Sequence, residues 1–382
     1  MVYQINMESV CSCIKDNPVD TKQARNSNFE LLRILSIIMI IGYHYVVHGN
    51  FSDVERVQDR IMLNILSSCG KMGVNIFCLT MGYFGIESQN VSTRKIIRIE
   101  GQVLFYSLLG LALGTVVDRQ LLSTRTILCS LFPTITEHYW FFSAYVIVFL
   151  LSCYLNRFLK SIRKGDFVKL LLLCYTLWGI IPFFTLRENH GLFWNQLIWF
   201  FVMYMTGAYL KLFSPKKYQM AYHFWGFTSI FLLMMSSVIC ELLALKIPAF
   251  EGYSTYFRWS NSPFVIVASF SLFCIAICSP EHTSKLINWI AGFVFGIYLF
   301  HENIFIRDIL WMKILDTVRF NTVGNLIIHF VLSLVIVFVV GCLFEYLRKL
   351  LECFYVDYLD LMANKVDNKI ISLINKLTKE QQ

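Results

Sequence analysis

Apolar stretches long enough to cross a lipid bilayer recur along most of this 382-residue chain. A membrane-spanning helix needs about 20 mainly apolar residues. Such stretches are predicted at about 31–49, 67–86, 101–117, 139–156, 167–185, 192–212, 222–245, 263–279, 285–304 and 325–347. Backbone groups in hydrocarbon must bond within their own segment, and the stretches lack the alternating pattern of a transmembrane β-barrel. The sequence therefore predicts an all-α integral membrane protein, a bundle of about ten transmembrane helices.

Composition supports this prediction and excludes other classes of protein. Hydrophobic residues make up 57% of the chain and charged residues only 15%, whereas a soluble domain has about 25% charged residues. Disordered proteins, nucleic-acid-binding modules and secreted disulfide scaffolds are therefore excluded. The net charge of +8 comes from basic residues scattered between apolar stretches, as expected of topology determinants. Most of the twelve cysteines lie inside apolar stretches, where free cysteine behaves as a small hydrophobe, so we expect neither zinc nor disulfides.

The distribution of Lys and Arg predicts the orientation. Segments on the side of the N-terminus hold about twice as many Lys and Arg as those on the other side. Both termini are therefore predicted to be cytoplasmic, and the polar start of the chain has no signal-peptide pattern. The predicted organisation is an N-terminal cytoplasmic segment (1–28), one transmembrane domain (29–350) and a cytoplasmic amphipathic tail (351–382).

The tail is predicted to be a helix with a narrow apolar stripe. The stripe recurs at steps of three and four residues and consists of Leu359, Ala363, Val366, Ile370, Leu373 and Leu377. Two interpretations remain open, because such a stripe suits both the inner membrane leaflet and a partner helix.

The first apolar stretch carries an unusual set of ionisable residues. Arg33 and His44 are eleven residues apart, a step that returns to within about 20° on a helix, so they share one face about 16 Å apart. Ionisable groups inside a membrane indicate function by default. Structural interpretations also exist. Arg33 can extend to the lipid headgroups, and Glu30 can be a first-turn residue that the helix dipole stabilises. His48 can belong to the outer membrane interface.

Further candidate residues lie in three later segments. Asn75 in the second stretch is a polar group that needs a partner, and the basic residues Lys95 and Arg98 follow it. This basic cluster suits positive-inside topology or, with Arg33, an anionic ligand at the cytoplasmic entrance. Aromatic residues at a helix end, such as Trp140, usually form an interfacial belt. His301 and Glu302 are predicted near the outer surface, in a position to contact a polar substrate.

Five motifs in order resemble one known family. They are Glu30-Leu-Leu-Arg33 followed by His44, Asn75-x-Phe-x-x-x-x-Gly-Tyr-Phe84, Lys95-x-x-Arg98, Tyr139-Trp-Phe-x-x-Ala-Tyr145 and Gly296-Ile-Tyr-Leu-x-His301. Together, from about residue 26 to 350, they resemble the type-3 membrane acyltransferase family. The resemblance implies a multi-pass enzyme of the bacterial inner membrane. Such an enzyme moves an acyl group, usually acetyl from acetyl-CoA, to a hydroxyl of a cell-surface polysaccharide or its lipid-linked precursor.

The resemblance also implies roles for individual residues. Arg33 and His44 match the first-helix signature of the family, and Lys95 and Arg98 match its basic motif. His44 is expected to act as a base or an acyl carrier, which suits histidine near neutral pH. The catalytic set is then His44 with Arg33, and the acetyl-CoA-binding set consists of Arg33, Lys95 and Arg98.

The expected acceptor-binding set is Trp140, His301, Glu302 and Asn75, and no metal is required. One departure from the family pattern is Met81, where the family commonly has a serine. No fused esterase-like domain is seen, so transfer is expected to finish within the bundle or its outer loops. Expected partners are acetyl-CoA, a glycan or lipid-linked oligosaccharide and membrane lipid, without nucleic acid. Direct transfer and an acyl-histidine intermediate both remain open.

A non-enzymatic glycan transporter, a flippase, is the main alternative. It explains the composition equally well but gives no reason for an Arg and a His on one helical face beside a basic cluster. A glycan polymerase is less favoured, because its catalytic charges are expected in large external loops.

Overall fold

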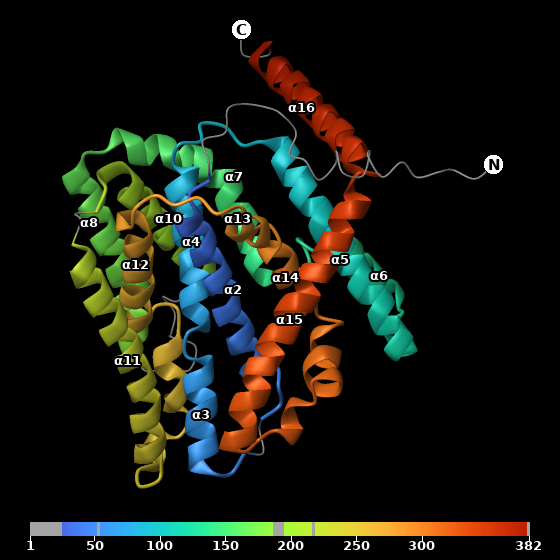
Figure 1. Cartoon of the computed structure of the whole chain (residues 1–382). Coiled ribbons are helices and arrows are strands. Elements are labelled where there is room, and N and C mark those ends of the chain that lie inside the picture. Colours follow the sequence, from blue (N-terminus) through green and yellow to red (C-terminus); the bar gives the residue numbers. More distant parts are fainter. Residues whose placement is uncertain (1–24, 52–53, 186–194, 216–217, 380–382) are drawn as a thin grey trace.

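The computed structural model describes residues 25–51, 54–185, 195–215 and 218–379. Most of the predicted N-terminal segment 1–28 lies outside this part. The described residues form helices and no strand (Figure 1). The longer helices are α2 (Ser27–Val47), α3 (Val57–Ser67), α4 (Gly70–Gly85), α5 (Thr93–Val117), α6 (Thr124–Leu131), α7 (Trp140–Ser161), α8 (Lys164–Tyr175), α10 (Gln196–Phe213), α11 (Gln219–Ala244), α12 (Pro263–Cys278), α13 (Lys285–Ala291), α14 (Val294–His301), α15 (Val323–Glu352) and α16 (Val356–Lys379). The shorter ones are η1 (Arg119–Leu121), η2 (Thr176–Ile180), α9 (Ile181–Phe184), η3 (Pro248–Phe250), η4 (Tyr253–Arg258), η5 (Ile309–Ile314) and η6 (Thr317–Arg319).

Nine helical segments within the described residues are long and apolar enough to cross a membrane. The all-α membrane prediction is therefore confirmed. The predicted tenth span, 285–304, differs: it is the shorter pair α13 and α14, within Lys285–His301, separated by a turn at Gly292. Because α14 ends inside the bundle, its last residues are buried among other helices.

Helices α2, α4 and α10 pack closely around the centre of the bundle. Glycines allow this approach: a Cβ atom at Gly73 would clash with the carbonyl group of Ser36 in α2. Gly82 lies in the same way against the backbone of Tyr204, and Gly207 of α10 against that of Leu79. Small residues at such crossings let membrane helices approach each other closely, and here they fix the positions of three helices.

Helix α15 shows why this bundle needs lipid as its solvent. It is the most apolar span, yet only 22% of its most apolar window is buried. Large side chains such as Ile328, Val335 and Val339 are more than half exposed on it. An exposed apolar surface of this extent suits contact with hydrocarbon rather than water.

The tail helix α16 packs first against its own bundle. Leu359 lies against Gly101 of α5, and the Asp360 carboxylate pairs with Arg98. Beyond this contact α16 projects from the bundle (Figure 1). The first turns of the tail therefore pair with helix α5 of the same chain, and contact of the tail with the inner leaflet stays a prediction. The side chain of Leu377, in the predicted stripe, lies outside the described part.

Candidate functional site

A cavity of about 540 Å³ lies inside the bundle. Its walls come from α2, α4, α5, α7, α10 and α14, and most of them are apolar. Ser88, Asn90 and Ser92, in the connection from α4 to α5, line one end, which we call the entrance. His44 lines the other end, which we call the His44 end. The cavity therefore connects a polar loop with a buried histidine.

Two cationic side chains line the cavity towards the entrance. The Arg33 guanidinium pairs with the carboxylate of Glu30, one turn earlier on α2, at 2.9 Å. The ammonium group of Lys95 lies 5.1 Å from the ring centroid of Phe149. All four side chains line the cavity. The eleven-residue step from Arg33 to His44 thus follows the cavity wall, as the helical periodicity predicts.

Arg98 has a different partner. Its Nε and Nη2 atoms donate to the two carboxylate oxygens of Asp360 at 2.7 and 2.6 Å. Such bidentate pairs are among the strongest ion pairs, and the Arg98 guanidinium holds the pKa of the Asp360 carboxyl below its usual value of 3.8. Arg98 is not among the residues that line the cavity. Because a three-residue step turns a helix by about 60° from alignment, Lys95 and Arg98 reach different surroundings.

His44 belongs to a buried cluster that the fold assembles from α2 and the end of α14. Its Nδ1 atom lies 3.0 Å from His301 Nε2 and 3.0 Å from Glu302 Oε2. His48, one turn further on α2, places its Nε2 atom 3.4 Å from the same Glu302 oxygen. His301 and Glu302 are only 0% and 5% exposed. Both side chains are therefore buried, because the short helix α14 ends within the bundle, and their position relative to the outer membrane surface stays a prediction.

The hydrogen bonds of the cluster assign the histidine tautomers. His301 Nδ1 lies 2.6 Å from the carbonyl oxygen of Ile297, and a carbonyl only accepts, so Nδ1 carries the proton. In neutral His301 the Nε2 lone pair then accepts the Nδ1 proton of His44. Neutral His44 is left with its lone pair on Nε2, the ring nitrogen that points away from His301. The cluster thus prepares one imidazole nitrogen as a proton acceptor or nucleophile.

The carboxylate of Glu302 is not fully satisfied. Among the described residues, its Oε2 atom has no hydrogen bond of good geometry, and neither has His48 Nε2. Arg307, in the segment after α14, lies 4.0 Å from the other carboxylate oxygen. A buried, incompletely bonded carboxylate beside two imidazoles stabilises a positive charge that develops on His44.

The same cluster has the composition of a metal site. His44, His48 and Glu302 each offer a ligand atom, and these atoms lie within 4.8 Å of one another. Two histidines and a glutamate, with water as the fourth ligand, form one of the known catalytic zinc sites. Ligation through His44 Nδ1 would, however, replace its hydrogen bond to His301. The bonding within the cluster therefore suits proton transfer better than metal binding.

Lys71, at the start of α4, lines the cavity close to His44. Its Nζ atom lies 5.1 Å from the ring centroid of Tyr43 and 5.3 Å from that of Trp140. The Tyr43 ring is in turn 5.6 Å from the His44 ring. Sequence reasoning missed Lys71, although a lysine inside an apolar stretch is itself a signal. Trp140 lines the cavity at the His44 end, beside Lys71.

Asn75 connects helices and does not line the cavity. Its amide nitrogen donates to the Ser260 carbonyl oxygen at 2.9 Å, and its amide oxygen accepts from Trp199 Nε1 at 3.0 Å. The asparagine is fully buried, so both halves of its amide are used to join α4 to α10 and to the segment before α12.

Comparison with known protein families identifies the chain's relationship. A family model described as an acyltransferase domain matches residues 26–346. No curated protein and no solved structure matches the chain. The matched region includes the whole cavity and the His44 cluster.

Proposed function

The chain belongs to the type-3 acyltransferase family, and from this premise we propose that it moves an acetyl group from acetyl-CoA to a hydroxyl of a cell-surface glycan or its lipid-linked precursor. It is a multi-pass membrane acyltransferase; donor, acceptor and residue roles are the proposal. The observation that carries the proposal is the cavity, with Arg33 and Lys95 towards one end and an oriented histidine at the other.

The donor occupies the entrance half of the cavity in this proposal. CoA carries phosphates far from its thioester, and Arg33 and Lys95 supply positive charge where those phosphates enter. The distance of about 16 Å from Arg33 to His44 along α2 is filled by the extended arm of CoA. The entrance then faces the cytoplasm of a bacterial cell, with α16 on the same side of the inner membrane.

His44 is the proposed base. Its Nε2 atom takes the proton of the acceptor hydroxyl while the hydroxyl oxygen attacks the thioester carbonyl carbon. The thiolate of CoA leaves and receives this proton, so the products are an ester and free CoA. Glu302 stabilises the imidazolium and His301 fixes the tautomer, in the way that a buried carboxylate supports a catalytic histidine. These two residues position His44, and Trp140 offers a stacking surface for a sugar.

The same Nε2 lone pair suits an acyl-histidine intermediate. Incubation with labelled acetyl-CoA in the absence of acceptor separates the two routes. Direct transfer leaves the protein unlabelled, whereas an acyl carrier gives label on the chain that His44→Ala removes.

Acetyl transfer from labelled acetyl-CoA into glycan, by membranes that contain this protein, tests the function. We expect incorporation by the natural chain, loss in His44→Ala by at least about 10³-fold, and no loss in the control His223→Ala. His223 suits the control because its Nδ1 atom bonds to the Gln219 carbonyl oxygen of its own helix and its side chain does not line the cavity.

Three results would contradict the proposal or part of it. Absence of transfer by the natural chain, with the native acceptor supplied, would favour a flippase. A melting temperature of the natural chain that does not rise when CoA is added would also favour a flippase. Transfer that survives His44→Ala would keep the acyltransferase and overturn the assigned base.

A further inference from the structure

Lys71 lies where few lysines are found. It is near the middle of the continuous apolar span Val57–Gly85, and a charge at such a depth is costly unless it has a partner. Among the described residues it forms no ion pair; its recorded contacts are the rings of Tyr43 and Trp140. Cation–π contacts hold an ammonium group in place without neutralising it. The cavity therefore contains an uncompensated cation at its His44 end.

The position of Lys71 separates it from the donor phosphates. Arg33 lies eleven residues before His44 on α2, about 16 Å away along the helix axis, and Lys95 belongs to the same entrance half. Lys71 instead lies over Tyr43, the neighbour of His44 in the sequence. The thioester itself is neutral. The Glu302 carboxylate at this end lies against His44 and His48 and forms no ion pair with Lys71 among the described residues. Within the cavity, Lys71 meets further negative charge when the reaction creates it or when the acceptor carries it.

We propose that Lys71 is a catalytic residue that stabilises the oxyanion formed on the acyl group. The inference rests on the proposed acetyl transfer. When the acceptor oxygen attacks the carbonyl carbon, the carbonyl π electrons move to oxygen and give it a negative charge. The Lys71 ammonium group binds this oxygen until the carbon–sulfur bond breaks and the charge leaves with the thiolate. A fixed donor in a site without water is worth far more than in solution.

Lys71→Met tests the proposal, because methionine keeps much of the side-chain length and removes the charge. We expect kcat to fall by about 10²–10³-fold, with KM for acetyl-CoA and for the acceptor changed by less than about threefold. Lys71→Arg keeps the charge and should retain more activity than Lys71→Met. The matched control is Lys211→Met: Lys211 also lies over a ring, that of Tyr83, but does not line the cavity.

A merely structural role would lower the melting temperature and the CoA-induced stabilisation of Lys71→Met, while kcat of the folded fraction stayed unchanged; this result would overturn the proposal. An increase in KM for the acceptor with kcat preserved would also overturn it, because Lys71 would then bind an anionic group of the acceptor. If the natural chain transfers acetyl and Lys71→Met equals it, this inference alone fails. If the natural chain transfers none, the proposed function fails as well.

Discussion

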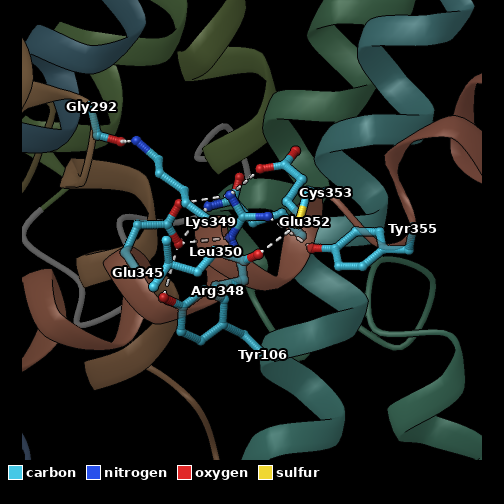
Figure 2. Close-up of polar contacts among 10 residues, drawn as sticks. Tyr106, Gly292, Glu345, Arg348, Lys349, Leu350, Glu352, Cys353 and Tyr355 are labelled. Carbon is cyan, nitrogen blue, oxygen red and sulfur yellow. Dashed lines mark hydrogen bonds and ion pairs between the residues drawn. The ribbon is translucent and has the colours of Figure 1, made fainter. Parts of the chain in front are cut away.

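A comparison of two clusters of buried charge in this bundle shows that they differ in how completely they are bonded. In the first, around His44, the Glu302 carboxylate and His48 retain polar atoms without an aligned hydrogen bond among the described residues. In the second, Glu345 and Arg348 of α15 are 1% and 4% exposed and fully bonded (Figure 2). The first cluster adjoins the cavity, whereas the second does not line it.

The second cluster joins helices. The Glu345 carboxylate accepts hydrogen bonds from Tyr106 and Gln102 of α5 as well as from Arg348. Arg348 also donates to Glu352 and to Tyr355, just before α16 (Figure 2). Buried charged residues thus have two different roles in this bundle. A complete network holds helices together, whereas an incomplete one beside a cavity is available for chemistry.

The largest effect is expected in the complete network. Arg348→Met leaves the Glu345 charge buried and unpaired, which typically costs about 3–5 kcal/mol. We expect a lower melting temperature in detergent, while kcat of the folded fraction is unchanged. Arg157→Met, at an exposed arginine, is the control. A melting temperature equal to that of the natural chain would show that the network does not stabilise the bundle.

Glu302→Gln should affect kcat rather than the melting temperature, the opposite of Arg348→Met. Removing the carboxylate charge beside His44 is expected to lower kcat by about 10²-fold, or about 2.7 kcal/mol, with little change in melting temperature. Glu241→Gln is the control, since this buried glutamate pairs with Arg60 and Asn64 away from the cavity. Unchanged kcat in Glu302→Gln would remove the distinction between the two clusters.

A smaller effect is expected at the entrance. Lys95→Ala should raise KM for acetyl-CoA by about tenfold, or about 1.4 kcal/mol, because Lys95 lines the cavity. Arg98→Ala should leave this KM unchanged, because its guanidinium is occupied by Asp360. Equal increases in both variants would restore the expectation that the two residues bind the donor together.

The smallest effect is expected at the tail. The pKa of Asp360 is lowered by Arg98, so the pair stabilises docking above the ordinary pKa of this carboxyl and is lost as pH falls through the lowered value. Asp360→Asn removes the pair at neutral pH, and exposed ion pairs contribute about 0.2–1 kcal/mol. We expect slightly faster amide hydrogen exchange in the first turns of α16. Unchanged exchange, as expected for the control Asp367→Asn, would show that Leu359 alone holds the helix.

The apolar stretches were sufficient to predict the fold, because hydrocarbon leaves a chain few alternatives to helices. They predicted one helix that is too long. The stretch 285–304 is apolar throughout most of its length, yet it forms two short helices. Local patterns also placed Arg33 and His44 on one face. They did not separate Lys95 from Arg98, because the partner of Arg98 lies on a helix far away in the sequence.

The sequence by itself determined that this protein lies in lipid, that it is helical, and that His44 is the candidate catalytic histidine. These properties follow from composition and from the repeat of a single helix, both of which are local. Only the tertiary structure decided which side chains surround that histidine. His301 and Glu302 are more than 250 residues from His44, and Lys71 reaches the cavity through the packing of α4 against α2. Contacts of this kind depend on where helices end and how they cross, which no single stretch of sequence specifies.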